Sequence, residues 1–230
     1  MINALKKELS DLANPEQAKV LQRFFKTGKG EYGEGDIFLG VTVPIQRKIA
    51  KKYSGIGLYK LQELIKSAIH EHRLISLIIL IEKYNNSDEE DKGNIFNFYL
   101  KNTKNINNWD LVDISAPKVF GNFLFDKKKN VLYKLANSNN LWERRIAIVS
   151  TFDFIRREEF ADTLRIAELL LKDEHDLIHK AVGWMLREVG KRDVIILEDF
   201  LKEHYKEMPR TMLRYAIEKF PEEKRKIYLM

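Results

Sequence analysis

The residues best suited to chemistry lie in one short stretch, which runs Asn107-Asn108-Trp109-Asp110-Leu111-Val112-Asp113. Trp109 and Asp113 are four residues apart, so on a helix their side chains share one face. An indole offers a flat surface for stacking or for a cation, and a carboxylate stabilises positive charge that develops beside it. Cleavage of an N-glycosidic bond develops such charge, because the sugar becomes oxocarbenium-like in the transition state. We therefore take this pair as a candidate site for that kind of reaction.

The rest of the sequence predicts helices that hold this stretch in place. Helices are expected over residues 3–12, 15–27 and 45–54, and from residue 57 onward they follow one another with short polar breaks. Asn14 followed by Pro15 is a typical helix start, because a cap precedes proline at the first helical position. No stretch alternates polar and apolar residues for long enough to indicate a strand. The expected fold class is all-α.

Five of the expected helices share a register. Their middles align as pentapeptides that begin at residues 73, 109, 145, 180 and 214, which are 36, 36, 35 and 34 residues apart. A period of this size is typical of stacked helical hairpins. We expect a single HEAT-like repeat domain over residues 1–230, an α-solenoid of antiparallel helix pairs with a concave groove. The third residue of each pentapeptide is apolar and the fourth is apolar or small, so both positions are expected to be buried.

The first and fifth positions of the pentapeptides do not follow the apolar pattern. They are i and i+4, so together they form one stripe along successive helices. The first positions hold Arg73, Trp109, Arg145, Lys180 and Arg214, and the fifth hold Leu77, Asp113, Val149, Trp184 and Glu218. Arg187 extends the stripe beyond Trp184. Because the inner helices of a solenoid line its concave face, we expect cations, tryptophans and one carboxylate there.

The charge balance favours a polyanionic partner. The net charge is +6 with a sequence pI of about 9.2, which is common in proteins that bind nucleic acid. Arg47 belongs to a further basic segment, 45–54, and cations suit a duplex backbone because phosphate contacts supply affinity. Two alternatives stay open on the residues alone. The tryptophans could be core residues with Asp113 paired to Arg145, or the array could be a scaffold that binds proteins.

Several other classes of protein are disfavoured. The chain has no cysteine, which excludes disulfides, thiolate metal sites and a cysteine nucleophile and fits a reducing cytoplasm. Apolar runs such as 74–81 are too short to span a bilayer. The glycine-rich segment 28–36 contains GxGxxG but follows a helix, so we interpret it as a loop. His175 and His179 lack a third metal ligand. We expect no metal, no cofactor, no membrane association and a monomer.

The sequence resembles the AlkD-type DNA alkylation repair family, bacterial DNA glycosylases built from HEAT-like repeats. The stretch from Trp109 to Asp113 is similar to the family's W-D-x-V-D motif, and residues 180–188 are similar to its K-A-x-G-W-x-L-R-E motif. Residues 38–44 with Arg47 resemble its FLG…P..R segment, and residues 141–145 resemble its W-x-x-R segment. The resemblance extends over about residues 15–221 and ends in a similar last helix.

The resemblance implies a function and a set of residues. It implies hydrolysis of the N-glycosidic bond of N3- and N7-alkylated purines in duplex DNA, as in base excision repair, by a monofunctional glycosylase that does not cleave the strand. Such bases carry positive charge and leave without a strong general acid. Asp113 would stabilise the deoxyribose cation and position water, with Trp109 and Trp184 on the sugar–phosphate. The DNA-binding residues expected from the resemblance and the stripe together are Arg145, Arg187, Lys180, Arg47, Arg73 and Arg214. A relative that binds DNA without catalysis remains the alternative.

Overall fold

The computed structural model describes residues 1–229. In this part of the chain every regular element is a helix, apart from one isolated parallel bridge between Ile37 and Ile69. The prediction of an all-α protein is therefore confirmed. No helix among these residues has the length and apolar character needed to cross a membrane.

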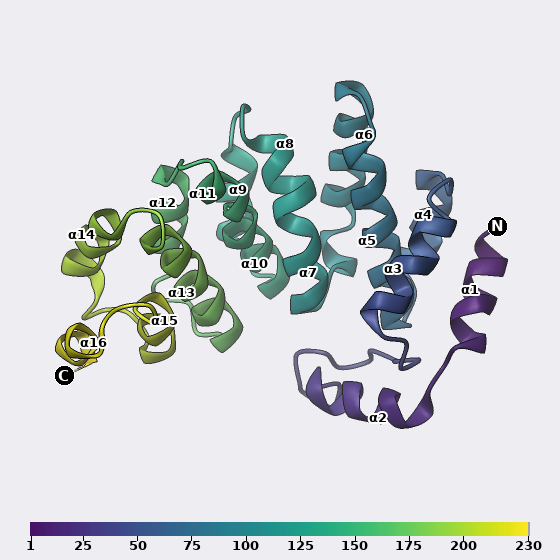
Figure 1. Ribbon diagram of the computed structural model, residues 1–230, viewed down its shortest axis with the longest axis horizontal. Coiled ribbons are helices and arrows are strands. Elements are labelled where there is room, and N and C mark those ends of the chain that lie inside the picture. Colours follow the sequence, from purple (N-terminus) through teal and green to yellow (C-terminus); the bar gives the residue numbers. More distant parts are fainter. Residues whose placement is uncertain (230) are drawn as a thin grey trace. The chain divides into compact units, whose positions relative to one another are not determined.

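The chain divides into two compact units, and the first, unit 1, is Met1–Ser115. Its helices, labelled in Figure 1, are α1 (Ile2–Asp11), α2 (Pro15–Phe24), α3 (Val43–Lys52), α4 (Leu58–Ile65), α5 (His70–Asn85), α6 (Glu89–Lys101) and α7 (Trp109–Ser115). A 3₁₀ turn, Thr103–Asn105, precedes α7. Helix α5 packs against both α3 and α7, and Figure 1 draws it between them. The stretch from Trp109 to Asp113 thus begins the last helix of unit 1.

The second unit, unit 2, starts at Ala116 with a π-helical turn that ends at Gly121. Its helices are α8 (Asn122–Leu124), α9 (Asn130–Ala136), α10 (Leu141–Ser150), α11 (Phe152–Arg156), α12 (Ala161–Leu169), α13 (Asp176–Gly190), α14 (Val194–His204), α15 (Arg210–Ala216) and α16 (Glu222–Leu229). Within unit 2, α13 lies against α10, α14 and α15. The single repeat domain over 1–230 and its concave groove stay predictions.

The repeat register is confirmed where it predicts the core. All third positions of the pentapeptides are buried, and so are all fourth positions. The third positions are Ile75, Leu111, Ala147, Val182 and Ala216, and the fourth are Ser76, Val112, Ile148, Gly183 and Ile217. One helical stripe therefore packs inward in each repeat, as the 3.6-residue period requires.

The helix that precedes the glycine-rich loop ends earlier than expected. Asn14 caps α2 by accepting the Gln17 N–H at 3.0 Å, as the sequence predicts. The helix stops at Phe24 and not near Thr27, because Lys26 adopts a left-handed conformation with φ 51°. Phe25, between the end of the helix and Lys26, is buried in the interior of unit 1.

Residues 38–42 form a pinned loop before α3. The buried carboxylate of Glu71, on α5, accepts the N–H groups of Leu39, Gly40 and Val41 at 2.9, 2.8 and 3.2 Å. Gly40 has φ 83°, and a Cβ there would lie 2.2 Å from the Asn14 carbonyl oxygen. Only glycine fits this position, because it combines a left-handed backbone with close approach of another chain segment. The loop thereby becomes a rigid neighbour of α5.

Candidate active site

Trp109 and Asp113 occupy the first and fifth positions of α7, one helical turn apart. Both side chains are half-buried, so they are neither core residues nor freely mobile on the surface. Because i and i+4 side chains share one face of a helix, the indole and the carboxylate have the relationship that the sequence predicts. Unit 1 thus presents an aromatic surface and an acid side by side.

Aromatic rings from the N-terminal part of unit 1 support the indole of Trp109. Phe25 stacks on it with ring centroids 5.1 Å apart and an interplanar angle of 24°. Phe24 contacts it edge-on at 5.8 Å and is itself 61% exposed. Phe25 in turn packs with Phe38 and Ala18 in a small apolar cluster. The orientation of Trp109 is therefore set from α2 and the loop before α3.

Polar bonds hold the first turn of α7 from the other side. The Asp110 carboxylate bonds to Nε2 of His70 at 2.8 Å, while His70 Nδ1 lies 3.1 Å from Asp36 Oδ2. Asn108 donates to Asp36 at 3.4 Å and accepts the Trp109 N–H at 2.8 Å. Sequence reasoning missed His70, because its partners Asp36 and Asp110 lie 34 and 40 residues away in the chain. The available signal in the sequence was an acid, Asp36, directly before the apolar residues that start at Ile37.

Arg73 does not take the role expected of it. It is 3% exposed, and its Nη2 lies 2.6 Å from Asp36 Oδ1 while Nη1 donates to the Ser67 carbonyl at 2.8 Å. The guanidinium is enclosed within unit 1, so the assignment of Arg73 to DNA binding is corrected to a structural one. The repeat spacing placed Arg73 on the same stripe as Trp109. However, Arg73 lies one turn into α5, where Asp36 and the Ser67 carbonyl enclose its guanidinium.

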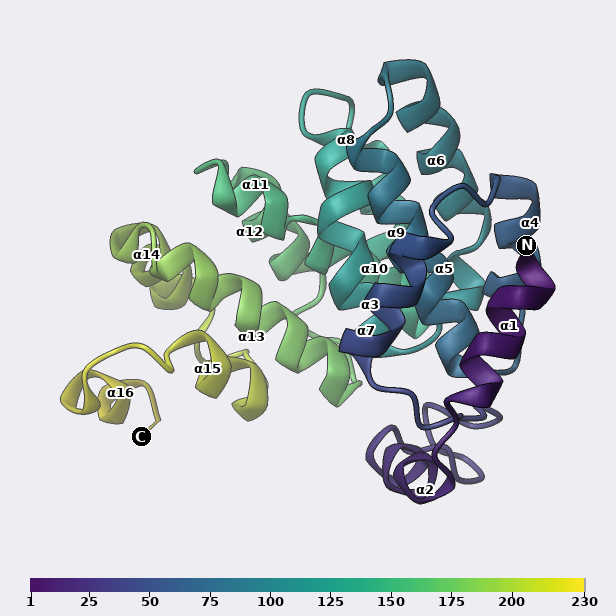
Figure 2. The same ribbon diagram turned by 45° about the vertical axis from the view of Figure 1, so that its right-hand side comes forward.

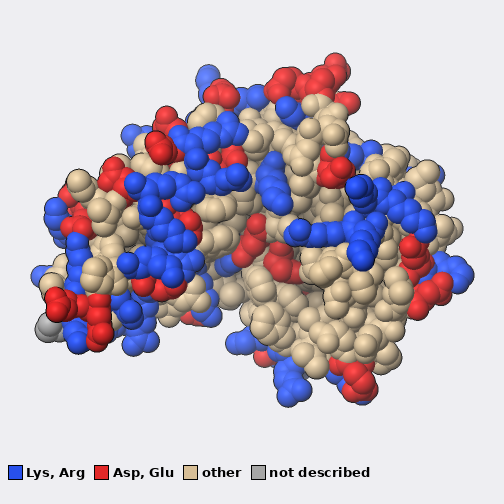
Figure 3. All heavy atoms as spheres, in the orientation of Figure 1, with Lys and Arg blue, Asp and Glu red and all other residues tan. Residues whose placement is uncertain are grey.

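The other cation expected in unit 1 is exposed. Arg47 lies on α3 with Lys48 and Lys51, which are also exposed. Figure 3 shows a patch of basic atoms in the region where Figure 1 draws α3. Lys52 at the end of α3 pairs with Glu8 at 2.8 Å. Arg47 is thus available to an anionic ligand.

In unit 2 the expected residues cluster on α13. Trp184 is half-buried, with its ring 5.7 Å from that of Phe152. The residue before it, Gly183, allows α13 to lie directly on α15, because a Cβ there would be 2.4 Å from the Met212 carbonyl oxygen (Figures 1 and 2). Lys180 and Arg187 lie four residues before and three after Trp184. One face of α13 therefore carries the tryptophan and both cations.

Most of the expected cations of unit 2 already have protein partners. Arg145, on α10, is 5% exposed and donates from Nη1 to the Leu177 carbonyl at 2.6 Å, which ties α10 to the first turn of α13. Arg187 pairs with Glu218, and Lys180 pairs with Asp176 at 2.7 Å. Arg214, on α15, is exposed. A phosphate at Arg187 or Lys180 would therefore have to compete with these carboxylates.

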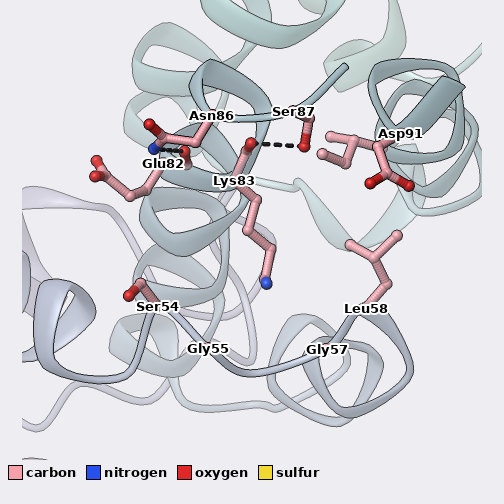
Figure 4. Close-up of a pocket in the computed structure, with 10 residues that line it drawn as sticks. Ser54, Gly55, Gly57, Leu58, Glu82, Lys83, Asn86, Ser87 and Asp91 are labelled. Atoms are coloured by element: carbon pink, nitrogen blue, oxygen red, sulfur yellow. Dashed lines mark hydrogen bonds between the residues drawn. The ribbon is translucent and has the colours of Figure 1, made fainter. Parts of the chain in front are cut away.

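A cavity of unit 1 lies away from α7. It has a volume of about 490 Å³ and is lined by residues of the α3–α4 turn, α5 and the start of α6. Figure 4 shows the Lys83 side chain pointing into it, while Ser87 and Asn86 bond to backbone carbonyls of α5. None of the site residues expected from the sequence lines it. The candidate chemistry of α7 thus belongs to a surface and not to this cavity.

The GxGxxG segment and the pair of His175 and His179, which the sequence analysis set aside as ligand sites, have structural roles. In the glycine-rich loop, Glu31 accepts the Gly28 N–H and Glu34 accepts the Gly30 N–H, each at 2.8 Å. These amides are therefore occupied by the loop's own acids and do not face a phosphate. His175 caps α13 by accepting the Leu177 N–H at 3.1 Å, and His179 contacts the Asp173 carbonyl.

One protein-family model matches most of the chain. The family model for DNA alkylation repair enzymes matches residues 5–220. Among solved structures, a predicted DNA alkylation repair enzyme from Enterococcus faecalis is similar with a TM-score of 0.69 at 18% identity, over 91% of this chain and 97% of that one.

Two structures from Streptococcus mutans share the fold as well. AlkD2 has a TM-score of 0.56 at 19% identity, over 90% of this chain and 98% of that one. The smu.31 protein of strain UA159 has a TM-score of 0.54 at 19% identity, over 95% and 98%. A search of curated proteins finds no match. At these identities the structural likenesses show a common helical fold.

Proposed function

Because this chain belongs to the family of DNA alkylation repair enzymes, we propose that it is a DNA glycosylase that removes N3- and N7-alkylated purines from duplex DNA. One observation carries the proposal. Trp109 and Asp113 lie one turn apart on α7, both half-buried, and the indole rests on Phe25. This arrangement offers a flat surface to a sugar and a fixed negative charge beside it.

The reaction follows from that charge. The bond between C1′ of the deoxyribose and N9 of the alkylated purine breaks, and its electron pair neutralises the positive charge of the departing base. The sugar becomes an oxocarbenium-like cation, which the Asp113 carboxylate stabilises at close range. A water molecule oriented by the same carboxylate adds to C1′ and releases its proton to solvent. The products are the free base and an abasic site, and the strand is not cut.

The cations supply binding energy and not chemistry. Arg47 in unit 1 and Arg214 in unit 2 are exposed and contact phosphates. Lys180 and Arg187 exchange their carboxylate partners for phosphate, and Trp184 packs against the sugar–phosphate backbone. Arg145 contributes mainly by holding α13 through Leu177. No residue in this set requires a base to enter a deep pocket, unlike most enzymes that act on bases in a duplex.

The test is release of N7-methylguanine from a duplex oligonucleotide, scored as abasic sites against a sample without protein. Wild type is expected to release the base, and Asp113→Asn to be slower by about 100-fold or more, because the substitution removes the stabilising charge. Asp91→Asn makes the same change at an exposed position of unit 1 and should match wild type.

Two results would overturn the proposal. Wild type that releases no base but binds the duplex with a steep dependence on salt would be a DNA-binding relative without this chemistry. Wild type that neither releases base nor binds would be an interaction scaffold.

A further inference from the structure

A buried charged network lies behind the start of α7. His70, the first residue of α5, is 1% exposed, and its imidazole bridges two carboxylates. Nε2 is 2.8 Å from Asp110 Oδ2, and Nδ1 is 3.1 Å from Asp36 Oδ2. Arg73 pairs with the other oxygen of Asp36 at 2.6 Å. The network therefore joins α5, α7 and the loop before α3.

The geometry favours a proton on each ring nitrogen of His70. An ionised carboxylate only accepts hydrogen bonds, so both nitrogens must donate, and only the imidazolium does this. The carboxylates of Asp110 and Asp36 then face two cations, His70 and Arg73. No buried charge in the network is left unpaired. Burial lowers the pKa of His70, but the bonds to Asp110 and Asp36 outweigh burial and hold that pKa above its ordinary value.

The remaining contacts agree with this protonation state. Burial raises the pKa of Asp36, but the hydrogen bond from His70 and the charge of Arg73 outweigh burial, so this carboxyl stays ionised with a pKa below its usual value. Arg73 Nη2 also approaches His70 Nδ1 at 3.5 Å, which as a hydrogen bond would need an unprotonated Nδ1. The shorter contacts of both groups to Asp36 account for that approach, because the two cations share one carboxylate. The Phe38 ring, stacked on the imidazole at 4.4 Å, favours a cation there.

Two sets of contacts connect His70 to the candidate site. Through Asp110, which directly follows Trp109, the imidazole holds the first turn of α7. Through Phe25, whose ring is 5.2 Å from the imidazole and stacked on the indole, it supports the orientation of Trp109. Asp113 lies one turn further along the same helix. A change at His70 therefore reaches both site residues.

We propose that His70 is a positioning residue of this site, which fixes the first turn of α7 by bridging Asp110 to Asp36 and so directs Trp109 and Asp113. Its catalytic consequence rests on the proposed function, while the bridge itself does not. Loss of a ring proton breaks one of the two bonds, either that from Nε2 to Asp110 or that from Nδ1 to Asp36, and so interrupts the link between α7 and the loop. The charged groups that face the ring are Asp110 from α7, Asp36 from the loop and Arg73 from its own helix.

The first experiment follows the bridge without catalysis. The chain has three tryptophans, so the ¹⁵N-labelled full chain gives a small set of indole N–H signals, in which Trp109→Phe assigns that of Trp109. The His70 ring signals, assigned with His70→Gln, and the Trp109 indole signal are followed from pH 6 to 10. Both should shift with one midpoint above about 6.5, the ordinary value for histidine.

The controls use the neighbouring histidine and the neighbouring acid. His70→Gln and Asp110→Asn should each abolish the shift of the Trp109 signal. His72→Gln should preserve it, because burial lowers the pKa of His72 to about 4, outside this range. Different midpoints for His70 and Trp109, or a Trp109 signal that does not respond, would overturn the proposal even if the His70 variant did not fold.

The second experiment measures single-turnover excision of N7-methylguanine over pH 6 to 9. Wild type should slow as His70 loses its proton, with the midpoint found for the ring. His70→Gln should be slower by roughly tenfold to a hundredfold, as expected for a small displacement of reacting groups, and should lack this pH dependence. A His70→Gln rate equal to wild type overturns the positioning role. If wild type excises no base, the proposed function is contradicted. The pH titration of the Trp109 indole signal still shows whether His70 bridges Asp110 and Asp36.

Discussion

The indole of Trp109 lies stacked on the ring of Phe25, with centroids 5.1 Å apart and planes 24° apart. Trp109 begins α7, whereas Phe25 directly follows α2, so two segments far apart in the sequence meet at this contact. Phe25 also stacks on Phe38 at 5.1 Å. The position of the candidate catalytic tryptophan therefore depends on the N-terminal helices of unit 1 and not on α7 alone.

Truncation of this support should affect both stability and excision. Phe25→Ala removes a buried ring and is expected to reduce the free energy of unfolding by about 3–5 kcal/mol, measured by urea denaturation. The excision rate should fall as well, because the indole loses the surface on which it rests. Phe24→Ala is the matched control for stability, since its ring is 61% exposed and should contribute little. Equal losses of stability in the two variants would contradict this account.

The close packing of α13 on α15 predicts that a side chain at Gly183 destabilises the protein. Gly183→Ala would bring a Cβ within 2.4 Å of the Met212 carbonyl oxygen and 2.5 Å of the Tyr215 Cβ. The helices must move apart, which should destabilise the protein by about 1–3 kcal/mol and displace the adjacent Trp184. Gly55→Ala is the control, because a Cβ there meets nothing within 4 Å. Unfolding curves of the two variants check this, and the idea fails if Gly183→Ala is as stable as Gly55→Ala.

His72 should make stability depend on pH. Burial, with the nearby charges of Lys6 and Arg73, lowers the pKa of His72 to about 4, so the fold holds its neutral form. Because the folded pKa is depressed, the stabilisation is complete above the unfolded value of about 6.5 and is lost as pH falls toward 4. Over that range the contribution of His72 to the free energy of unfolding should fall by roughly 3 kcal/mol.

The comparison that isolates this effect is His72→Asn against wild type. Urea unfolding between pH 7 and 4 should show wild type losing more stability than the variant, because carboxylates contribute alike to both. Parallel pH profiles for the two proteins would mean that His72 does not carry the effect.

The two arginines of unit 1 should behave differently when DNA binds. Arg47→Gln, on the exposed face of α3, should reduce the slope of log K against log salt by about one, as expected for one lost phosphate contact. Arg73→Gln should leave the slope unchanged and instead reduce stability by about 3–5 kcal/mol, because it leaves the buried Asp36 carboxylate with one cation fewer.

Lys7→Gln controls for the loss of a positive charge on the surface, since Lys7 pairs with Asp11 on α1. Fluorescence anisotropy on a labelled duplex at several salt concentrations gives the slopes. An Arg73 variant with a reduced slope and normal stability would contradict the structural role of Arg73.

The sequence by itself determined the helices and their inward faces. The period of the pentapeptides identified the buried positions from Ile75 to Ile217, and the i, i+4 spacing placed Trp109 and Asp113 on one face of one helix. These properties are local, because 3.6 residues per turn fix which side chains share a face once a segment is helical. The same spacing also put the motif of Trp184 on one helix with Lys180 and Arg187.

Only the tertiary structure decided which stripe residues are covered. Arg73 and Trp109 occupy equivalent repeat positions, yet the guanidinium is enclosed by Asp36 while the indole stays half-buried on Phe25. The covering groups come from the loop before α3 and the end of α2, which lie outside the repeat. His70 likewise gains its role from Asp36 and Asp110, one on each side of it in the chain. Spacing within a helix cannot predict such partners, because they come together only when separate helices pack.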